Sequence, residues 1–234
     1  MVKREIISAT ELPQRIKEFI VLLTSEQRDE FNAHVSVQRY AKNDLIYAEG
    51  DVSTHMCFLL SGKVKISKVG IGGRTQIVRV LKPVEYFGYR AYFAQENYVT
   101  SASAFETSVV CKIPMSLIDK WMQVNIRLSL FFVRQLSVYL GDSDQRTVSL
   151  TQKHIRGRLA EALLFLYDRY GVEADGQTLA IRLSREDLAS LSNMTTSNAI
   201  RTLSTFAAEG LITVDKRTIR IDQLQQLEKI SQMG

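Results

Sequence analysis

The spacing of apolar residues changes from helical to strand-like at about Val35 and returns to helical at about Ser116. Over residues 11–33 apolar residues recur at helical spacing, and residues 24–27 resemble a capping box that opens a second short helix. After Val35, short apolar or alternating runs are separated by glycine-containing turns, and residues 70–73 favour a hairpin loop. Such closely spaced strands are typical of an antiparallel barrel or jelly roll. The expected strands cover residues 44–48, 56–60, 64–69, 75–81, 101–105 and 107–113.

From about Ser116 the spacing is helical, and residues 124–140 are mostly apolar on two sides of one predicted helix. One stripe contains Leu128, Phe132, Leu136 and Tyr139, and a second contains Leu130, Val133 and Leu140. A helix buried within one monomer is one interpretation, but two apolar faces favour pairing with a second copy of the chain. Residues 141–144 are either a polar stretch within this helix or a break in it.

Residues 184–203 contain two short helical patterns separated by a turn. Ser184 can cap the first helix and Thr195 the second, while Asn193 lies at the turn, where a left-handed residue is needed. This arrangement is typical of a helix-turn-helix, whose second helix enters the DNA major groove. The expected buried face of that helix comprises Ala199, Ile200, Leu203 and Phe206, and its open face comprises Thr196, Ser197, Asn198 and Arg201.

Two short strand patterns at residues 211–214 and 218–221 follow, joined by a turn that contains Lys216 and Arg217. A basic hairpin beside a helix-turn-helix indicates the wing of a winged helix, although two ordinary core helices and a hairpin are the simpler alternative. Arginine can pair bidentately with guanine, and cations on phosphate supply most of the affinity for DNA. The sequence therefore predicts base reading by Arg201 and phosphate contacts from the wing.

Composition narrows the classes of protein that fit. The 234 residues carry a net charge of +5, which tolerates a polyanion partner, and no stretch is apolar enough to cross a membrane. With no signal-peptide pattern, the expected location is the cytoplasm. Cys57 and Cys111 are too few for a four-thiolate iron–sulfur cluster, which is thereby excluded. His34, His55 and His154 lack metal-ligand spacing, so no metal site is expected.

The order of these parts resembles the CRP/FNR family of bacterial transcription regulators. The resemblance rests on Glu49-Gly50-Asp51, Leu60-Ser61-Gly62-Lys63-Val64, Phe87-Gly88, Gly157-Arg158-Leu159-Ala160 and residues 184–203 and 211–221. It implies an α+β fold with an N-terminal antiparallel β-roll (jelly roll), a long dimerisation helix and a C-terminal winged helix-turn-helix. The roll and the dimerisation helix (about 116–150) are expected to form residues 1–150, and the DNA-binding domain residues 151–234.

By the same resemblance, Thr196, Ser197 and Arg201 occupy base-reading positions and Arg185 is a contact to the DNA backbone. Two departures from the family pattern are Thr202, where an aliphatic residue usually packs, and Lys216, which replaces the usual glycine of the wing turn. The complete set of predicted DNA-binding residues is Arg185, Thr195, Thr196, Ser197, Asn198, Arg201, Lys216 and Arg217.

The residues that correspond to the effector pocket of the family, mainly within 87–100, depart further from the family pattern. Tyr89 replaces the glutamate that accepts a ribose hydroxyl in cyclic-AMP-binding members, and Val99 replaces the arginine that neutralises the cyclic phosphate. A buried phosphate without a charged partner is costly, so cyclic AMP is not expected and the cofactor or effector stays unknown. Arg90 either serves another anion or is a surface residue. The predicted effector pocket comprises Phe87, Gly88, Tyr89, Arg90, Val99, Thr100 and Ser143.

These features predict a homodimeric, sequence-specific DNA-binding transcription regulator, not an enzyme, controlled by an unidentified signal at the roll. The expected partners are double-stranded DNA, a second copy of the chain, a small-molecule effector and, as a further candidate, RNA polymerase. One alternative is a cyclic-nucleotide-binding-type module that regulates a protein partner. The other is a cupin-like barrel enzyme, although the sequence contains no His-x-His.

Overall fold

The computed structural model describes residues 16–234, and the chain divides into two compact units. The roll unit contains the described residues up to Val69 together with Val78–Leu140. The C-terminal unit contains Gly70–Ile77 and Gly141–Gly234. Residues 11–15 of the first predicted helical region lie outside the described residues.

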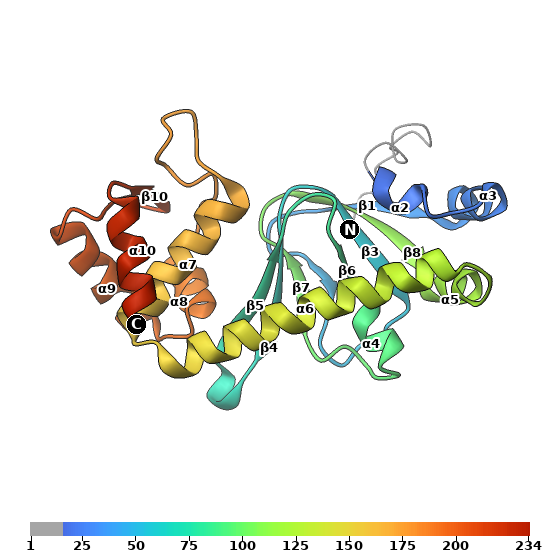
Figure 1. Cartoon of the computed structure of the whole chain (residues 1–234), viewed down its shortest axis with the longest axis horizontal. Coiled ribbons are helices and arrows are strands. Elements are labelled where there is room, and N and C mark those ends of the chain that lie inside the picture. Colours follow the sequence, from blue (N-terminus) through green and yellow to red (C-terminus); the bar gives the residue numbers. More distant parts are fainter. Residues whose placement is uncertain (1–15) are drawn as a thin grey trace. The chain divides into compact units, whose positions relative to one another are not determined.

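Two four-stranded sheets form the roll unit and confirm the predicted antiparallel β-roll (Figure 1). The first has the order β1 (Ser36–Tyr40), β8 (Ser108–Pro114), β3 (His55–Ser61), β6 (Tyr86–Phe87). The second has the order β2 (Leu45–Tyr47), β7 (Ser101–Ala104), β4 (Val64–Val69), β5 (Thr75–Leu81). The one-turn helix η1 (Ile71–Gly73) connects β4 to β5, at the expected hairpin loop. Strands β1 and β6 were not expected from the sequence.

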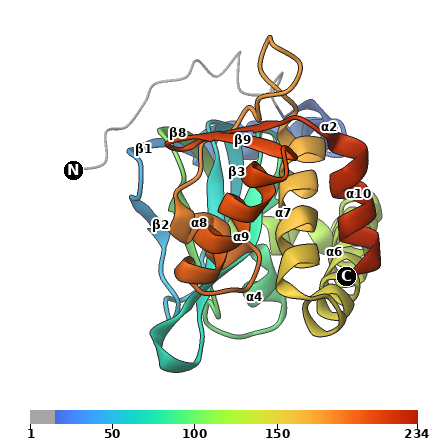
Figure 2. The ribbon, with the colours of Figure 1, turned by 90° about the vertical axis from the view of Figure 1, so that its left-hand side faces the viewer.

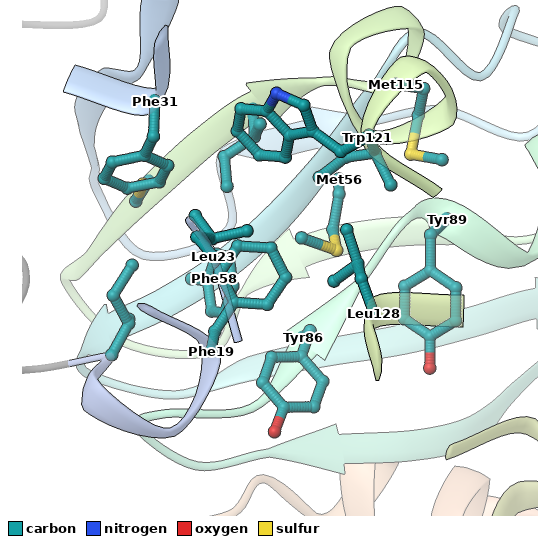
Figure 3. Packing of buried hydrophobic residues seen from close by; sticks show 14 of the residues in the cluster. Phe19, Leu23, Phe31, Met56, Phe58, Tyr86, Tyr89, Met115, Trp121 and Leu128 are labelled. Atoms are coloured by element: carbon teal, nitrogen blue, oxygen red, sulfur yellow. The ribbon is translucent and has the colours of Figure 1, made fainter. Parts of the chain in front are cut away.

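Strand β3 separates two hydrophobic clusters because successive side chains of a strand point to opposite faces. Met56 and Phe58 belong to a cluster with the neighbouring helices, shown in Figure 3. Cys57 and Leu59 belong to the cluster that contains residues of both sheets. Burial on both faces explains why the strand is apolar at every position from Met56 to Leu60.

Four short helices complete the roll unit: α2 (Lys17–Ile20), α3 (Ser25–His34), α4 (Tyr89–Phe93) and α5 (Met115–Val124). The predicted capping box is present, because Thr24 accepts from the Gln27 backbone and the Gln27 side chain accepts from the Thr24 backbone. The prediction of unbroken helix after Ser116 is wrong at Asn125, which separates α5 from α6. Its side-chain amide donates to Leu22 O and Gln27 Oε1, both at 2.8 Å.

Helix α6 (Ile126–Gln152) is unbroken through residues 141–144, which are therefore a polar stretch within a long helix (Figure 1). The boundary expected near residue 150 falls in its last turn. Its two apolar stripes differ in environment. Leu128 and Phe132 are buried in the helix-facing cluster, whereas Leu130, Val133 and Leu140 are 47%, 58% and 64% exposed.

The C-terminal unit contains α7 (Ile155–Tyr170), α8 (Arg185–Leu191), α9 (Thr196–Ala208), β9 (Ile212–Asp215), β10 (Thr218–Ile221) and α10 (Leu224–Met233). Helix α10 packs along α7, and α8 packs against α9 (Figure 2). Strands β9 and β10 pair in an antiparallel hairpin. Among the described helices, none is long and apolar enough to cross a membrane.

Candidate nucleic-acid interface

Helices α8 and α9 begin at the residues whose side chains can cap them. Ser184 Oγ accepts from the Asp187 backbone N–H at 3.0 Å, and Thr195 Oγ1 accepts from the Asn198 backbone N–H at 3.2 Å. Asn193 between the two helices has φ 50°, the left-handed conformation that asparagine tolerates better than most residues. These local features explain why the predicted helix-turn-helix forms here.

The buried face of α9 differs at one position from the expected one. Ala199, Leu203 and Phe206 are buried, but Ile200 is 48% exposed and Thr202 is only 8% exposed. Because a residue turns by about 100° in a helix, positions three, four and seven after Ala199 share its face, and position 200 does not. Thr202 therefore packs in the core, and Ile200 adds an apolar side chain to the open face.

The open face begins with the first turn of α9. Thr195, Thr196 and Ser197 are exposed there, Asn198 is half-buried, and Arg201 is exposed one turn after Ser197. The structure thus brings the predicted polar residues together on one side of the helix. Ile200 follows Ser197 by three residues and lies beside them, which sequence reasoning missed by assigning it to the core.

Cations of this unit differ in whether a carboxylate neutralises them. Arg156 pairs with both carboxylate oxygens of Glu209, and Arg220 Nε lies 2.7 Å from Asp222 Oδ1. In contrast, Arg201 forms no ion pair with any described residue. The same holds for Arg185, which is half-buried at the start of α8, and for the exposed Arg182, Lys216 and Arg217. Arg182 was not among the predicted contacts.

The wing is a tight hairpin in which Asp215 pairs with Thr218, leaving Lys216 and Arg217 as the loop. Lys216 has φ 50°, at a position where glycine is favoured because it has no Cβ. Lysine thus adopts the left-handed conformation of this turn, and the hairpin pairing forms around it. Both loop side chains are exposed.

Helix α8 is also held by the first residues of β5, Thr75 to Ile77, which belong to the same unit. The Ser190 hydroxyl donates to Thr75 O at 2.7 Å and accepts from the Ile77 N–H at 2.8 Å. Arg146 Nη2 donates to Ile77 O at 2.6 Å and to Leu191 O at 3.0 Å. Sequence patterns gave no signal for these contacts, since the residues are far apart in the chain.

The predicted effector residues lie in several environments. Phe87 and Tyr89 are buried on either side of Gly88, whose carbonyl accepts from Ser53 Oγ at 2.8 Å. Arg90 is exposed and its Nη2 lies 2.8 Å from Glu96 Oε1. Lys68 Nζ donates to the Val99 carbonyl at 2.8 Å, beside the half-buried Thr100. Ser143 is exposed on the part of α6 that belongs to the C-terminal unit.

Family models match both units of the chain. Residues 37–125 match the cyclic nucleotide-binding domain, and residues 157–230 match the Crp-like helix-turn-helix domain. Together the two models cover more than half of the sequence. The second match contains α8, α9 and the wing.

Curated relatives and solved structures resemble the chain over most of its length. It is 26% identical to the global nitrogen regulator of Nostoc sp. over 188 residues, 79% of this chain and 84% of the relative. It is 22% identical to the CRP-like cAMP-activated global transcriptional regulator of Mycobacterium tuberculosis, over 81% of this chain and 85% of the relative. The structure of FixK2 from Bradyrhizobium japonicum superposes with a TM-score of 0.75 at 21% identity, covering 84% and 96% of the chains. The chain belongs to the CRP/FNR family of helix-turn-helix transcription regulators.

Proposed function

We propose that α9 reads specific DNA sequences through its open face, with Arg201 on a base edge and Lys216 and Arg217 on phosphates. The observation that carries this proposal is the set of exposed cations without carboxylate partners beside the capped start of α9. Arg185 at the start of α8 would contact the DNA backbone. Small hydroxyl side chains around Arg201 leave room for a base pair, and Ser or Thr can bond to either bases or phosphates.

Homodimerisation through α6 is the second part of the proposal. The stripe of Leu130, Val133 and Leu140 is exposed in the single chain, and Ile126 and Val138 extend the exposed apolar surface at 70% and 59% exposure. A contiguous apolar surface of this kind favours contact with another protein surface. Twofold symmetry then places two DNA half-sites about one helical turn apart.

The roll unit is proposed to receive the controlling signal, and cyclic AMP is not proposed as that signal. Tyr89 is buried at the position of the family glutamate, and no arginine stands at Val99. A metal-dependent cupin-like enzyme has no support in residues 16–234, where no group of three or more His, Cys, Asp or Glu could hold a metal ion. A module that regulates only a protein partner leaves Arg201 of α9 and the wing residues Lys216 and Arg217 without a role.

Selection of bound duplexes from random DNA by the purified full chain tests this function. The expected result is a two-fold symmetric site with half-sites about one turn apart, bound by a protein that sedimentation shows to be a dimer at micromolar concentration. Retention of all sequences equally would disprove sequence reading. A strict monomer in the absence of DNA would disprove the role of α6.

A further inference from the structure

Arg79 on β5 carries a buried guanidinium nitrogen without a partner. Its Nη2 has no hydrogen-bond partner among the described residues and is shielded from solvent. The guanidinium carbon lies 3.9 Å from the centroid of the Tyr139 ring on α6. A cation over a ring face is stabilised by the ring quadrupole, but this contact leaves the in-plane N–H groups unbonded.

Several other cations of the roll unit have carboxylate partners. Lys63 pairs with Glu106, Lys68 with Glu49 and Arg90 with Glu96, at distances between 2.8 and 2.9 Å. No described carboxylate pairs with Arg79. Nearly all buried polar groups in proteins have a partner, and a missing one costs about 1–3 kcal/mol, more for a charged group. The shielded and unpartnered Nη2 of Arg79 therefore requires an explanation.

A second unpartnered polar atom belongs to Tyr89. The Tyr89 ring is 2% exposed and packs against Phe132 of α6, with its hydroxyl pointing away from Met115 (Figure 3). That hydroxyl is shielded from solvent and lies near the Tyr139 hydroxyl, but no contact of hydrogen-bond length joins it to a described residue. Burial, followed by the proximity of the Tyr139 hydroxyl, raises the pKa of Tyr89, while the Arg79 charge acts in the opposite direction. The raised pKa keeps this hydroxyl protonated and able to donate.

We propose that Arg79, Tyr89 and Tyr139 form a binding site for a compact organic anion at the junction of β5, α4 and α6. The anionic group, a carboxylate or a phosphate, accepts from Arg79 Nη2 and from the Tyr89 hydroxyl, and the aromatic rings contact the rest of the ligand. The proposal rests on the proposed function, in which the roll unit receives the signal. It assigns the charge recognition to Arg79 on β5 and not to Arg90 on α4, whose guanidinium already pairs with Glu96.

The position of Tyr139 on α6 allows ligand binding to affect the rest of the chain. Tyr139 lies on the part of α6 that is in the roll unit, and the same helix continues to Gln152 in the C-terminal unit. An anion bonded to the in-plane N–H groups would draw the Arg79 guanidinium toward itself and alter its contact with the Tyr139 ring. Binding would thereby change a contact made by the helix that joins the two units.

Calorimetry and thermal unfolding of the full chain without DNA test the site, at constant ionic strength. The probes are acetate, benzoate, inorganic phosphate, adenosine monophosphate and cyclic AMP. We expect saturable binding of at least one probe, weakened at least about tenfold by Arg79→Gln, because this variant removes a hydrogen bond to a charged group. Tyr89→Phe, which removes only the hydroxyl, should weaken binding about two- to tenfold. Comparison of the carboxylate probes with the phosphate probes shows which of the two anionic groups the site binds.

Control variants make the result specific. Lys120→Gln removes one exposed, ion-paired charge from the same unit and should leave anion binding unchanged. If Arg79→Gln does not fold, Arg79→Lys keeps the charge without the planar donors and should bind more weakly than the parent chain. Binding that survives in the Arg79 variants, or that disappears only in Arg90→Gln, overturns the proposal, as does the absence of saturable binding. Specific DNA retention is measured separately, so its loss alone would count against the proposed function and not against this site.

Discussion

Unpaired cations occupy different environments in the two units of the chain. In the C-terminal unit, Arg201, Lys216 and Arg217 are exposed, and water solvates them until a partner arrives. In the roll unit, Arg79 has a nitrogen shielded from water and without a protein partner. An exposed cation suits a large polyanion that binds from outside, whereas a shielded cation suits a small anion that enters the protein. The same side chain thus points to two kinds of ligand because burial differs.

Replacement of Arg201 tests the exposed side of this contrast and should have the largest effect. A bidentate Arg–guanine pair is worth about 1–3 kcal/mol, so Arg201→Ala should weaken the preferred site by roughly 5- to 150-fold. Binding to a scrambled duplex should change far less. Titrations on both duplexes measure the difference, with Arg220→Ala, whose guanidinium is paired with Asp222, as the matched control. Equal weakening on both duplexes would make Arg201 a phosphate contact.

Replacement of Arg79 tests the shielded cation of the roll unit. The quantity measured is the free energy of unfolding in the absence of any organic anion. Arg79→Met removes an unsatisfied donor worth about 1–3 kcal/mol and also removes a cation–π interaction, worth from about 0.5 kcal/mol at an exposed site to about 2 kcal/mol at a desolvated one. The difference predicts a more stable protein, by about 1 kcal/mol, in urea unfolding. Arg201→Met, at an exposed position, should leave stability nearly unchanged. Destabilisation by Arg79→Met would show that the guanidinium is satisfied without a ligand.

The wing sharpens the contrast because Lys216 combines an exposed charge with a backbone conformation that favours glycine. Lys216→Gly should raise stability by about 0.5 kcal/mol, since φ 50° costs glycine little. It should also weaken all duplexes about equally and reduce the salt dependence of binding by about one unit for each phosphate that the variant no longer neutralises. Binding titrations at several salt concentrations measure this. A changed sequence preference would instead place Lys216 on a base.

Lowering the pH should have the smallest effect on stability, because it protonates the carboxylates that pair with cations. Hydrogen bonds from Lys120 and Trp121 lower the pKa of Glu30, and the hydrogen bond from Arg156 lowers the pKa of Glu209. Because the folded-state pKa of each group is depressed, its contribution is present above the unfolded pKa, near 4.5, and is lost as the pH falls through the folded value. Melting temperatures between pH 7 and 3 should fall less steeply for Glu30→Gln. Glu209 is exposed and Glu30 is only half-buried, so water screens both ion pairs and the change should be slight.

The helix-turn-helix could be predicted because its signals are local. The caps at Ser184 and Thr195 and the turn residue Asn193 act within three residues of their own positions, so the sequence contains the full pattern. The burial of Thr202 and the exposure of Ile200 were not predicted. Hydrophobicity favoured Ile200, whereas helix geometry buries position 202.

Features that depend on distant contacts could not be predicted. The break at Asn125 is fixed by bonds to Leu22 and Gln27, about a hundred residues away in sequence. Strand β1 carries mixed polar residues and forms because β8 offers a pairing edge. Arg79 looks like an ordinary polar position in an alternating strand. Its lack of a partner depends on α4 and α6, which no local pattern relates to β5.

The length of α6 gives two of its side chains a fixed spacing. Tyr139, which stacks on Arg79, and Arg146, which holds the backbone carbonyls of Ile77 and Leu191, are one heptad apart. Seven residues make nearly two turns, so both lie on one side of the helix and are about 10 Å apart along its axis. Because α6 is one unbroken helix, a displacement of Tyr139 along its axis would move Arg146 by the same distance, and the cation–π contact and the carbonyl contacts would be disturbed together.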